Sequence, residues 1–239
     1  MKLKHNIRAI LNFLHLDITK NLEYDRLTKL IIKRVVKKDS VCIDIGCHKG
    51  EILDLILQQS PMGGHYGFEP IPLLYKKLID NYSPENYILP YAIGENPGKA
   101  SFQYVKNAPA YSGLQKRKYA VKNPEIEEIE VEIIPLDNII PSSIKIDFIK
   151  IDVEGAEYGV LKSAKRIIRE NKPIIIFECG LGASDFYGTK PEEVFNFLTS
   201  NSLKISILKS WLKNKSPLSL NEFCDLYIKN KEYYFIAHP

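Results

Sequence analysis

The chain has 239 residues, of which 45% are apolar and 26% charged, so it can bury a sizeable core and remain soluble. The net charge of +4 is too small for a dedicated nucleic-acid binder, and we expect no nucleic-acid partner. No run approaches the ~20 apolar residues of a membrane span. The four cysteines form no Cys-x-x-Cys pair, which argues against a zinc site or a disulfide framework and favours a cytoplasmic protein.

Two amphipathic helices are expected before the first strand, and we take the first of them as a helix rather than a signal peptide. The apolar residues that share a face are Ile7, Ile10, Leu11 and Leu14 in the first helix, and Leu27, Leu30, Ile31 and Val35 in the second. We therefore expect a helical lead-in over residues 1–38 and a catalytic domain over residues 39–239. The lead-in helices are candidate contacts of a homo-oligomer.

Strands and helices then alternate. The pattern predicts strands at 41–45, 65–69, 87–90, 148–153, 173–178, 203–208 and 233–237, and helices at 52–56, 73–78, 156–168 and 192–198. Such alternation predicts a doubly wound α/β fold with a mostly parallel sheet. Two further strands, at 100–105 and 129–134, lack a helix between them, and the polar segment 106–124 is long enough to be functional. Residues 210–231 carry no motif that we can use.

A glycine-bearing turn, from Asp44 through Gly46 to Gly50, follows the first strand and opens a helix. Glycine lets the backbone turn tightly and approach a ligand. Glu69 ends the next strand, where an acid holds the ribose hydroxyls in nucleotide-binding α/β folds. The spacing is not that of a pyrophosphate loop, whereas Asp44 could balance the positive groups of S-adenosylmethionine (SAM). The alternative is a helix-start turn with an incidental acid.

Two carboxylates, Asp152 and Glu154, lie at the carboxyl end of the predicted strand 148–153. In open α/β sheets, ligands bind in the crevice at that end of the strands. Burying an unpaired carboxylate is costly, so each needs a partner or a task. We take both as candidate catalytic residues, and we prefer a structural role for Glu157. The alternative is that Glu154 favours the helix dipole and Asp152 accepts backbone hydrogen bonds.

Glu178 likewise ends a predicted core strand. With Asp44, Glu69 and Asp152 it places four acids along one edge of the sheet, which predicts a single site. Glu178 is a third candidate catalytic base, and His48 a fourth, although a lone histidine in a loop is more often structural. Clustered carboxylates suit Mg²⁺ or Ca²⁺, but the sequence does not require a metal, and we assign none.

The centre of the chain, from about 41 to 178, resembles the FkbM-type methyltransferase family. The segments that carry the resemblance are Cys42-Ile43-Asp44-Ile45-Gly46, Gly67-Phe68-Glu69-Pro70, Tyr91-Ala92-Ile93-Gly94, Ile133-Ile134-Pro135-Leu136-Asp137, and residues 148–164 and 173–178. The resemblance implies a Rossmann-like class I methyltransferase fold with a seven-stranded sheet and an antiparallel last strand at 233–237. It also implies a SAM-dependent O-methyltransferase that acts on a hydroxyl of a sugar, glycan or small metabolite.

On the family pattern, Asp44 and Gly46 line the methionine end of SAM, Glu69 holds the ribose, and the region of Ala92 and Ile93 flanks the adenine. The expected cofactor contacts are Asp44, Gly46, His48, Gly50, Glu69, Pro70, Ala92, Ile93 and Asp152. The chain departs from the family at Cys47-His48, where Ala-Asn is common. It also keeps only Tyr111-Ser112-Gly113-Leu114 of a stretch that is often rich in serine.

The segment 106–122 is expected to form a lid over the acceptor. Its basic run beside tyrosines favours an anionic acceptor such as an acidic glycan or a nucleotide sugar, although a solvated basic loop is the alternative. The expected substrate contacts are Tyr111, Ser112, Lys116 and Arg117.

Three rival functions remain. An NAD-dependent oxidoreductase shares the fold, but the Gly-x-Gly-x-x-Gly motif is missing. A nucleic-acid methyltransferase often carries an Asn/Asp-Pro-Pro-Tyr motif, which does not occur here. The third rival is a catalytically silent SAM-binding protein.

Overall fold

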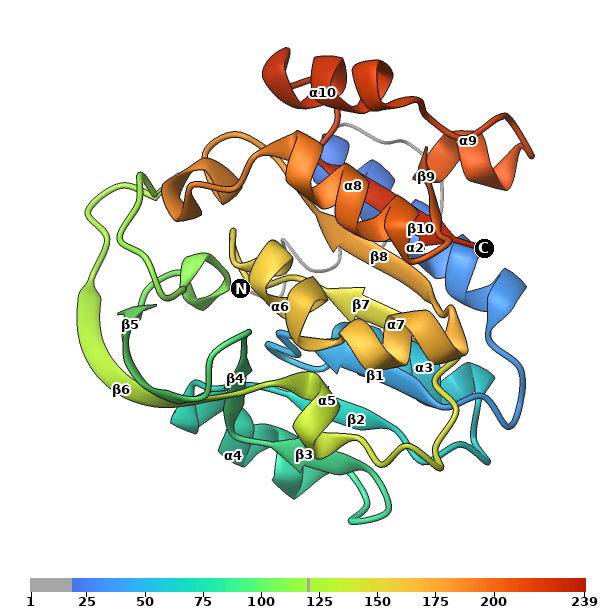
Figure 1. Ribbon diagram of the computed structural model, residues 1–239. Coiled ribbons are helices and arrows are strands. Elements are labelled where there is room, and N and C mark those ends of the chain that lie inside the picture. Colours follow the sequence, from blue (N-terminus) through green and yellow to red (C-terminus); the bar gives the residue numbers. More distant parts are fainter. Residues whose placement is uncertain (1–18, 120) are drawn as a thin grey trace.

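A computed structural model describes residues 19–119 and 121–239 (Figure 1). The predicted helix around residues 7–14 lies outside the described residues. The helices are α2 (Lys20–Val35), α3 (Glu51–Gln59), α4 (Pro72–Asn81), α5 (Leu136–Ile139), α6 (Glu157–Ser163), α7 (Lys165–Asn171), α8 (Pro191–Ser200), α9 (Leu208–Leu212) and α10 (Leu220–Ile228), with the 3₁₀ turns η1 (Pro109–Tyr111) and η2 (Ser184–Tyr187). The strands are β1 (Cys42–Ile45), β2 (Tyr66–Phe68), β3 (Tyr87–Leu89), β4 (Tyr91–Ile93), β5 (Gly98–Val105), β6 (Ile126–Ile134), β7 (Phe148–Ile151), β8 (Ile174–Glu178), β9 (Lys204–Ile207) and β10 (Tyr234–His238).

The main sheet confirms the predicted doubly wound α/β fold. Its seven strands run in the order β3-β2-β1-β7-β8-β10-β9. All pairs among β3, β2, β1, β7 and β8 are parallel, whereas β10 is antiparallel to both β8 and β9, as predicted for the last strand. The chain runs outward from β1 to β3 and then returns to β7 on the other side of β1. That reversal creates a crevice at the carboxyl ends of β1 and β7.

Helices cover both faces of this sheet. Figure 1 shows α6, α7 and α8 in front of the sheet and α2 behind it. One core cluster joins α2 and α3 to Phe148 of β7 and Ile176 of β8, and the other joins α6, α7, α8 and α10 to the alternate residues of the same strands. On α2, Leu27 and Ile31 are buried as predicted, but Leu30 is 43% exposed because it lies at the edge of the buried helical face.

A second sheet, in the order β4-β6-β5, lies beside the carboxyl edge of the main one. Strands β5 and β6 pair antiparallel, which confirms the two strands that were expected without a helix between them. Strand β4 pairs parallel with β6. The sequence indicated Tyr91–Ile93 only as a segment flanking the cofactor, because three residues are too few to show a strand period.

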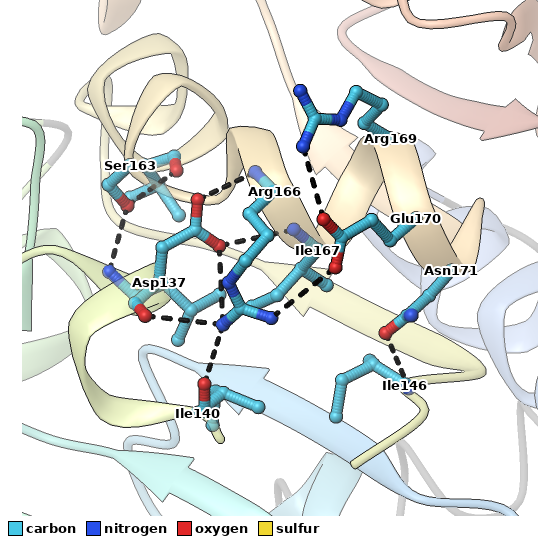
Figure 2. Close-up of polar contacts among 11 residues, drawn as sticks. Asp137, Ile140, Ile146, Ser163, Arg166, Ile167, Arg169, Glu170 and Asn171 are labelled. Atoms are coloured by element: carbon cyan, nitrogen blue, oxygen red, sulfur yellow. Dashed lines mark hydrogen bonds and ion pairs between the residues drawn. The ribbon is translucent and has the colours of Figure 1, made fainter. Parts of the chain in front are cut away.

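The single helix predicted after β7 is two helices, α6 and α7, which break at Ala164. The Asp137 carboxylate accepts the backbone N–H groups of Arg166 at 2.6 Å and Ile167 at 3.1 Å, and so caps the start of α7. The Arg166 guanidinium returns hydrogen bonds to the carbonyls of Asp137 and Ile140, at 3.2 and 2.5 Å (Figure 2). Asp137 therefore has a structural role, fastening α5 to α7.

Helix α10 lies wholly within residues 210–231, the region in which the sequence showed no motif that we could use. Helix α10 begins at a capping box, in which the Ser219 side chain and the Glu222 side chain each bond the other residue's backbone N–H. No helix among residues 19–119 and 121–239 is long and apolar enough to cross a membrane.

Candidate functional site

On each central strand, the side chains that face α2 change from apolar to polar near one edge of the sheet. Side chains of a strand alternate between its two faces, so residues two apart share a face. Each strand places an apolar residue in the α2-side core and a polar residue two positions away: Cys42 and Asp44 on β1, Phe148 and Lys150 on β7, Ile176 and Glu178 on β8, and Ile236 and Tyr234 on β10. The register pairs Asp44 with Lys150 and Glu178 with Tyr234. A polar cluster therefore forms where α2 begins.

Lys150 is the buried cation of this cluster, with only 3% of its surface exposed. Its ammonium group donates to Oδ2 of Asp152 at 3.1 Å and lies 4.6 Å from the centre of the Tyr234 ring. The Tyr234 hydroxyl donates to the same carboxylate oxygen at 2.5 Å. Within the described chain, no hydrogen bond engages the other oxygen of Asp152, and 36% of that side chain is exposed. Asp152 is thus held by one oxygen and free at the other.

Two more carboxylates lie at the ends of neighbouring strands: Asp44 is near the end of β1, and Glu69 directly follows β2. Asp44 is 2% exposed, and its Oδ2 has no hydrogen-bond partner among the described residues. Glu69 is 3% exposed and accepts the backbone N–H of His48 at 2.7 Å and that of Ile71 at 2.9 Å. Burial raises the pKa of Asp44 to about 7, against the opposing charge of Lys150. Burial likewise raises the pKa of Glu69 to about 7.

The glycine turn brings the end of β1 against the end of β7. Gly46 has φ +86°, and a Cβ placed there would lie 2.0 Å from the carbonyl oxygen of Asp152, so no larger residue fits. The N–H groups of Gly46 and Cys47 both donate to the carbonyl of Phe68, which ties the turn to β2. Gly50, with φ +84°, starts α3. The Glu69 carboxylate completes the turn through its bond to the His48 N–H.

Glu178 is the least satisfied acid of the cluster. Among the residues that the structure describes, its carboxyl makes no hydrogen bond or ion pair. Burial raises its pKa well above the ordinary value, and the nearby charges of Asp152 and Glu157 raise it further, while Lys150 and Arg117 act in the opposite direction. Glu178 therefore holds its proton to a higher pH than an ordinary glutamate, and its carboxyl is available to a hydroxyl of a bound ligand.

Glu154 and Glu157 differ in their partners. Glu154 has φ +59° and forms an ion pair with Arg117, whose side chain is 8% exposed. Glu157 is 2% exposed and accepts the N–H groups of Val153 and Gly155, each at 3.1 Å. The Glu157 carboxylate thus shapes the backbone after β7, in keeping with the structural role preferred for it.

Two cavities open at this edge of the sheet. The first, which we call the Glu69 cavity, has about 590 Å³ of empty space, and the second, the tyrosine cavity, has about 1190 Å³, in both cases including space open to solvent. The tyrosine cavity is lined by Tyr24, Tyr111, Tyr233, Tyr234 and Glu178, among others. The residues that line both cavities are Gly46, His48, Ala110, Asp152 and Glu154. The two cavities therefore adjoin along these residues, and Asp152 is one of them.

The structure gathers most of the predicted cofactor contacts around the Glu69 cavity. The predicted residues that line it are Gly46, His48, Glu69, Pro70, Ala92, Ile93 and Asp152. Asp44 is buried and interacts electrostatically with both Glu69 and Asp152, but its side chain does not line either cavity. Gly50 also lies away from both cavities, where a Cβ would meet the Tyr82 hydroxyl at 2.1 Å.

The predicted acceptor contacts are divided. Tyr111 and Arg117 line the tyrosine cavity. Ser112 lines the Glu69 cavity, but its hydroxyl accepts the N–H of Val105 at 3.0 Å and so closes the β5 turn. Lys116 is exposed and lines neither cavity. Of the two cations predicted to contact an anionic acceptor, Arg117 is paired with Glu154 and Lys116 lines neither cavity.

Sequence reasoning missed one wall of the tyrosine cavity. Helix α2 supplies Asn21 and Tyr24, β10 supplies its first residue, Tyr234, and Tyr233 directly precedes that strand. A Tyr-Tyr pair at the head of a predicted strand was a visible signal, but its contact with α2 was not. Among the described residues, no group of three or more His, Cys, Asp or Glu side chains is arranged to hold a metal ion.

Comparison with known proteins shows the family that the chain matches. The family model of the methyltransferase FkbM domain matches residues 44–204, more than half of the chain. The chain is similar to the crystal structure of methyltransferase FkbM from Methylobacillus flagellatus KT, with 17% identity and a TM-score of 0.53 over 84% of this chain and 44% of that one. The chain thus spans less than half the length of that protein. This similarity supports a shared Rossmann-like class I methyltransferase fold.

A more distant similarity is to fibrillarin from Aeropyrum pernix, crystallised with natively bound S-adenosyl-L-methionine, with 14% identity and a TM-score of 0.45 over 90% of this chain and 74% of that one. No curated protein matches the chain by sequence.

Proposed function

Because this chain belongs to the FkbM methyltransferase domain family, we propose that it transfers a methyl group from SAM to a hydroxyl oxygen of a sugar, glycan or small metabolite. The observation that carries this proposal is the junction of the Glu69 and tyrosine cavities at Asp152. Two molecules bound side by side would meet there, next to a carboxylate oxygen that has no other partner among the described residues.

The residues around the Glu69 cavity fit the groups of SAM. Each carboxylate oxygen of Glu69 accepts one backbone N–H and keeps a lone pair for a ribose hydroxyl. Pro70, Ala92 and Ile93 supply an apolar wall suited to adenine. Asp44 lines neither cavity, so its buried carboxyl, with Oδ2 unpaired among the described residues, can favour the positive methionine end only through space and only when ionised.

The chain's own residues then account for the proton and the acceptor. When bound, SAM supplies a methyl group on a positively charged sulfur, which leaves with the bonding electrons as a neutral thioether once an acceptor oxygen takes the methyl carbon. The free oxygen of Asp152 takes the proton that the acceptor hydroxyl loses. Lys150 and Tyr234 hold the other oxygen, so the base is oriented before the acceptor arrives. Glu178, whose carboxyl no described residue binds, can form a hydrogen bond with a hydroxyl of the acceptor.

The segment 106–122 fits the role of a lid. The side chain of Arg117, in this segment, forms an ion pair with Glu154, which lines both cavities. The Arg117 guanidinium also donates to the carbonyl of Gly182 at 3.3 Å. Tyr111 of the same segment lies in the tyrosine cavity. These contacts support a segment that closes over the junction once both molecules are bound. The four unpaired, buried cysteines support our proposal of a cytoplasmic setting.

Transfer of radiolabelled methyl groups from SAM to a panel of hydroxylated acceptors tests the proposal. We expect a labelled ether product, with the Asp152→Asn variant slower by about 10²–10⁴-fold and its SAM affinity largely kept. The Glu154→Gln variant provides a comparison, since Glu154 is already paired with Arg117 and should lose less. SAM binding without transfer to any acceptor would favour the silent SAM-binding protein, and a full rate in the Asp152→Asn variant would remove Asp152 as the base.

A further inference from the structure

We propose that the tyrosine cavity binds an uncharged, hydroxylated ring, and that its tyrosine wall comes from segments outside residues 44–204, the range that the FkbM family model matches. This inference rests on the proposed function, because the cavity is the acceptor site only if methyl transfer takes place at Asp152. It replaces the anionic acceptor expected from the sequence. Three features of the cavity support it: its rings, its charges and its unpaired hydrogen-bonding groups.

The tyrosine wall is fixed in place by contacts between α2 and β10. The Tyr24 ring stacks on the Tyr234 ring at 4.9 Å and meets the Tyr233 ring edge-on, also at 4.9 Å. The Tyr24 hydroxyl donates to Glu232, and the Tyr233 hydroxyl donates to Asn21, each at 2.5 Å. Because these hydroxyls are already bonded, the wall offers rigid ring surface to a ligand, at little cost in conformational entropy.

The residues that form the tyrosine wall lie outside the part of the sequence that the family model matches. The family model matches residues 44–204, whereas α2 ends at Val35 and β10 begins at Tyr234. The cofactor side of the site therefore lies within the range that the family model matches, and this wall of the tyrosine cavity lies outside that range. We infer that α2 and β10 select the acceptor.

The charges in the cavity oppose an anion. Arg117 lines the cavity and is paired with Glu154, and Lys150, which does not line the cavity, is paired with Asp152. Among the described residues that line the cavity, Lys49 is a further cation, and it is exposed at the rim beside Glu51. An acidic acceptor would have to break one of the buried ion pairs or lie next to the Asp152 carboxylate, and both are costly.

The unpaired polar groups suit hydroxyls instead. Asp152 offers one free carboxylate oxygen as an acceptor, and Glu178 offers a carboxyl that no described residue binds. A carboxyl accepts hydrogen bonds from hydroxyls in either protonation state, so the pair can bond neighbouring hydroxyls on one ring while the ring faces a tyrosine. The cavity has about 1190 Å³ of empty space, part of it open to solvent, which leaves room for such a ring with substituents.

Ligand-observed NMR on the chain saturated with S-adenosylhomocysteine tests this inference. The probes are matched pairs of methyl hexosides and the corresponding methyl hexuronides, which differ in the carboxylate. We expect at least one neutral member to bind and its acidic counterpart to bind at least 10-fold more weakly. The Tyr233→Ala and Tyr111→Ala variants should each weaken the neutral probe at least 10-fold with unchanged affinity for S-adenosylhomocysteine. The control is Tyr87→Ala, since Tyr87 is 53% exposed on the edge strand β3.

The outcomes separate this inference from the proposed function. Equal or tighter binding of the acidic probes, no binding of any neutral probe, or unchanged binding in both tyrosine variants would overturn the inference alone, provided that S-adenosylhomocysteine binds. Failure of the parent chain to bind S-adenosylhomocysteine by calorimetry would overturn the proposed function as well. Two variants are used because Tyr233 also bonds Asn21, whereas Tyr111 comes from a surface turn whose loss leaves α2 in place.

Discussion

Replacing Lys150 with methionine should destabilise the protein, and more at high pH than at low pH. Methionine keeps the length of the side chain but removes the ammonium group that lies 3.1 Å from Asp152 Oδ2. At an effective dielectric constant of about 20, that pair is worth at most about 5 kcal/mol. Because 36% of the Asp152 side chain is exposed, water replaces part of this interaction, and we expect a loss of about 2–3 kcal/mol, in the range of a charged hydrogen bond.

The pH dependence follows from the neighbouring acids. Lys150 lowers the pKa of Asp44 and of Glu178, so without it both carboxyls hold their protons to a higher pH. Ionising them then costs more, and the stability lost in Lys150→Met should be larger at pH 8 than at pH 5.5. Urea unfolding at the two pH values measures this difference.

The control is Lys99→Met, which removes an exposed ion pair with Glu130 and should cost less than about 1 kcal/mol at either pH. A second comparison is the double variant Lys150→Met with Asp152→Asn, which should recover part of the loss because it removes the carboxylate left unpaired. If Lys150→Met is as stable as the parent at pH 8, the buried ammonium does not hold the acidic cluster together, and this reasoning is wrong.

Two further predictions concern stability. Without cofactor, the parent should lose stability as the pH rises from about 4.5 to about 7: the pKa of Glu69 is raised from 4.5 to about 7, so the folded chain binds more protons than the unfolded chain in that window. Thermal melts at pH 5.5 and 8 should show this, and Glu69→Gln should flatten the profile; a parent more stable at pH 8 would contradict it. Asp137→Ala should cost about 0.5–2 kcal/mol through loss of the α7 cap, with SAM affinity unchanged in calorimetry, and altered affinity would mean that Asp137 does more than cap a helix.

The sheet could be predicted from the sequence because buried strands dominate its pattern. Alternating apolar strands and helices indicated the parallel sheet, and the resemblance to the FkbM family supplied the antiparallel last strand. The break at Ala164 was missed, since alanine favours a helix and the break depends on capping by Asp137, which is distant in sequence. Helix α10 was missed although its capping box, Ser219-x-x-Glu222, can be seen in the sequence.

The site was predictable where it follows from strand ends. Acids at the carboxyl edge were identifiable because parallel strands bring their ends together. The tyrosine wall was not, since Asn21 and Tyr233 are 212 residues apart and meet only when α2 docks on the sheet. The pairing of Arg117 with Glu154 was equally hidden, because composition shows a basic loop but not its partner. Lys150 could have been noticed, since a charged residue interrupts an otherwise apolar central strand.

Calorimetric titration of the chain with SAM, and separately with NAD, tests the central claim most directly. We predict that SAM binds with a Kd in the low micromolar range, roughly −8 kcal/mol, and that NAD does not bind. Glu69→Ala should weaken SAM binding by about 1–3 kcal/mol, because the carboxylate that would receive the ribose hydroxyls is lost. Circular dichroism would confirm that the variant is folded, since Glu69 also accepts two backbone N–H groups. Absence of SAM binding in the parent, or equal SAM affinity in folded Glu69→Ala, would contradict the assignment of the Glu69 cavity.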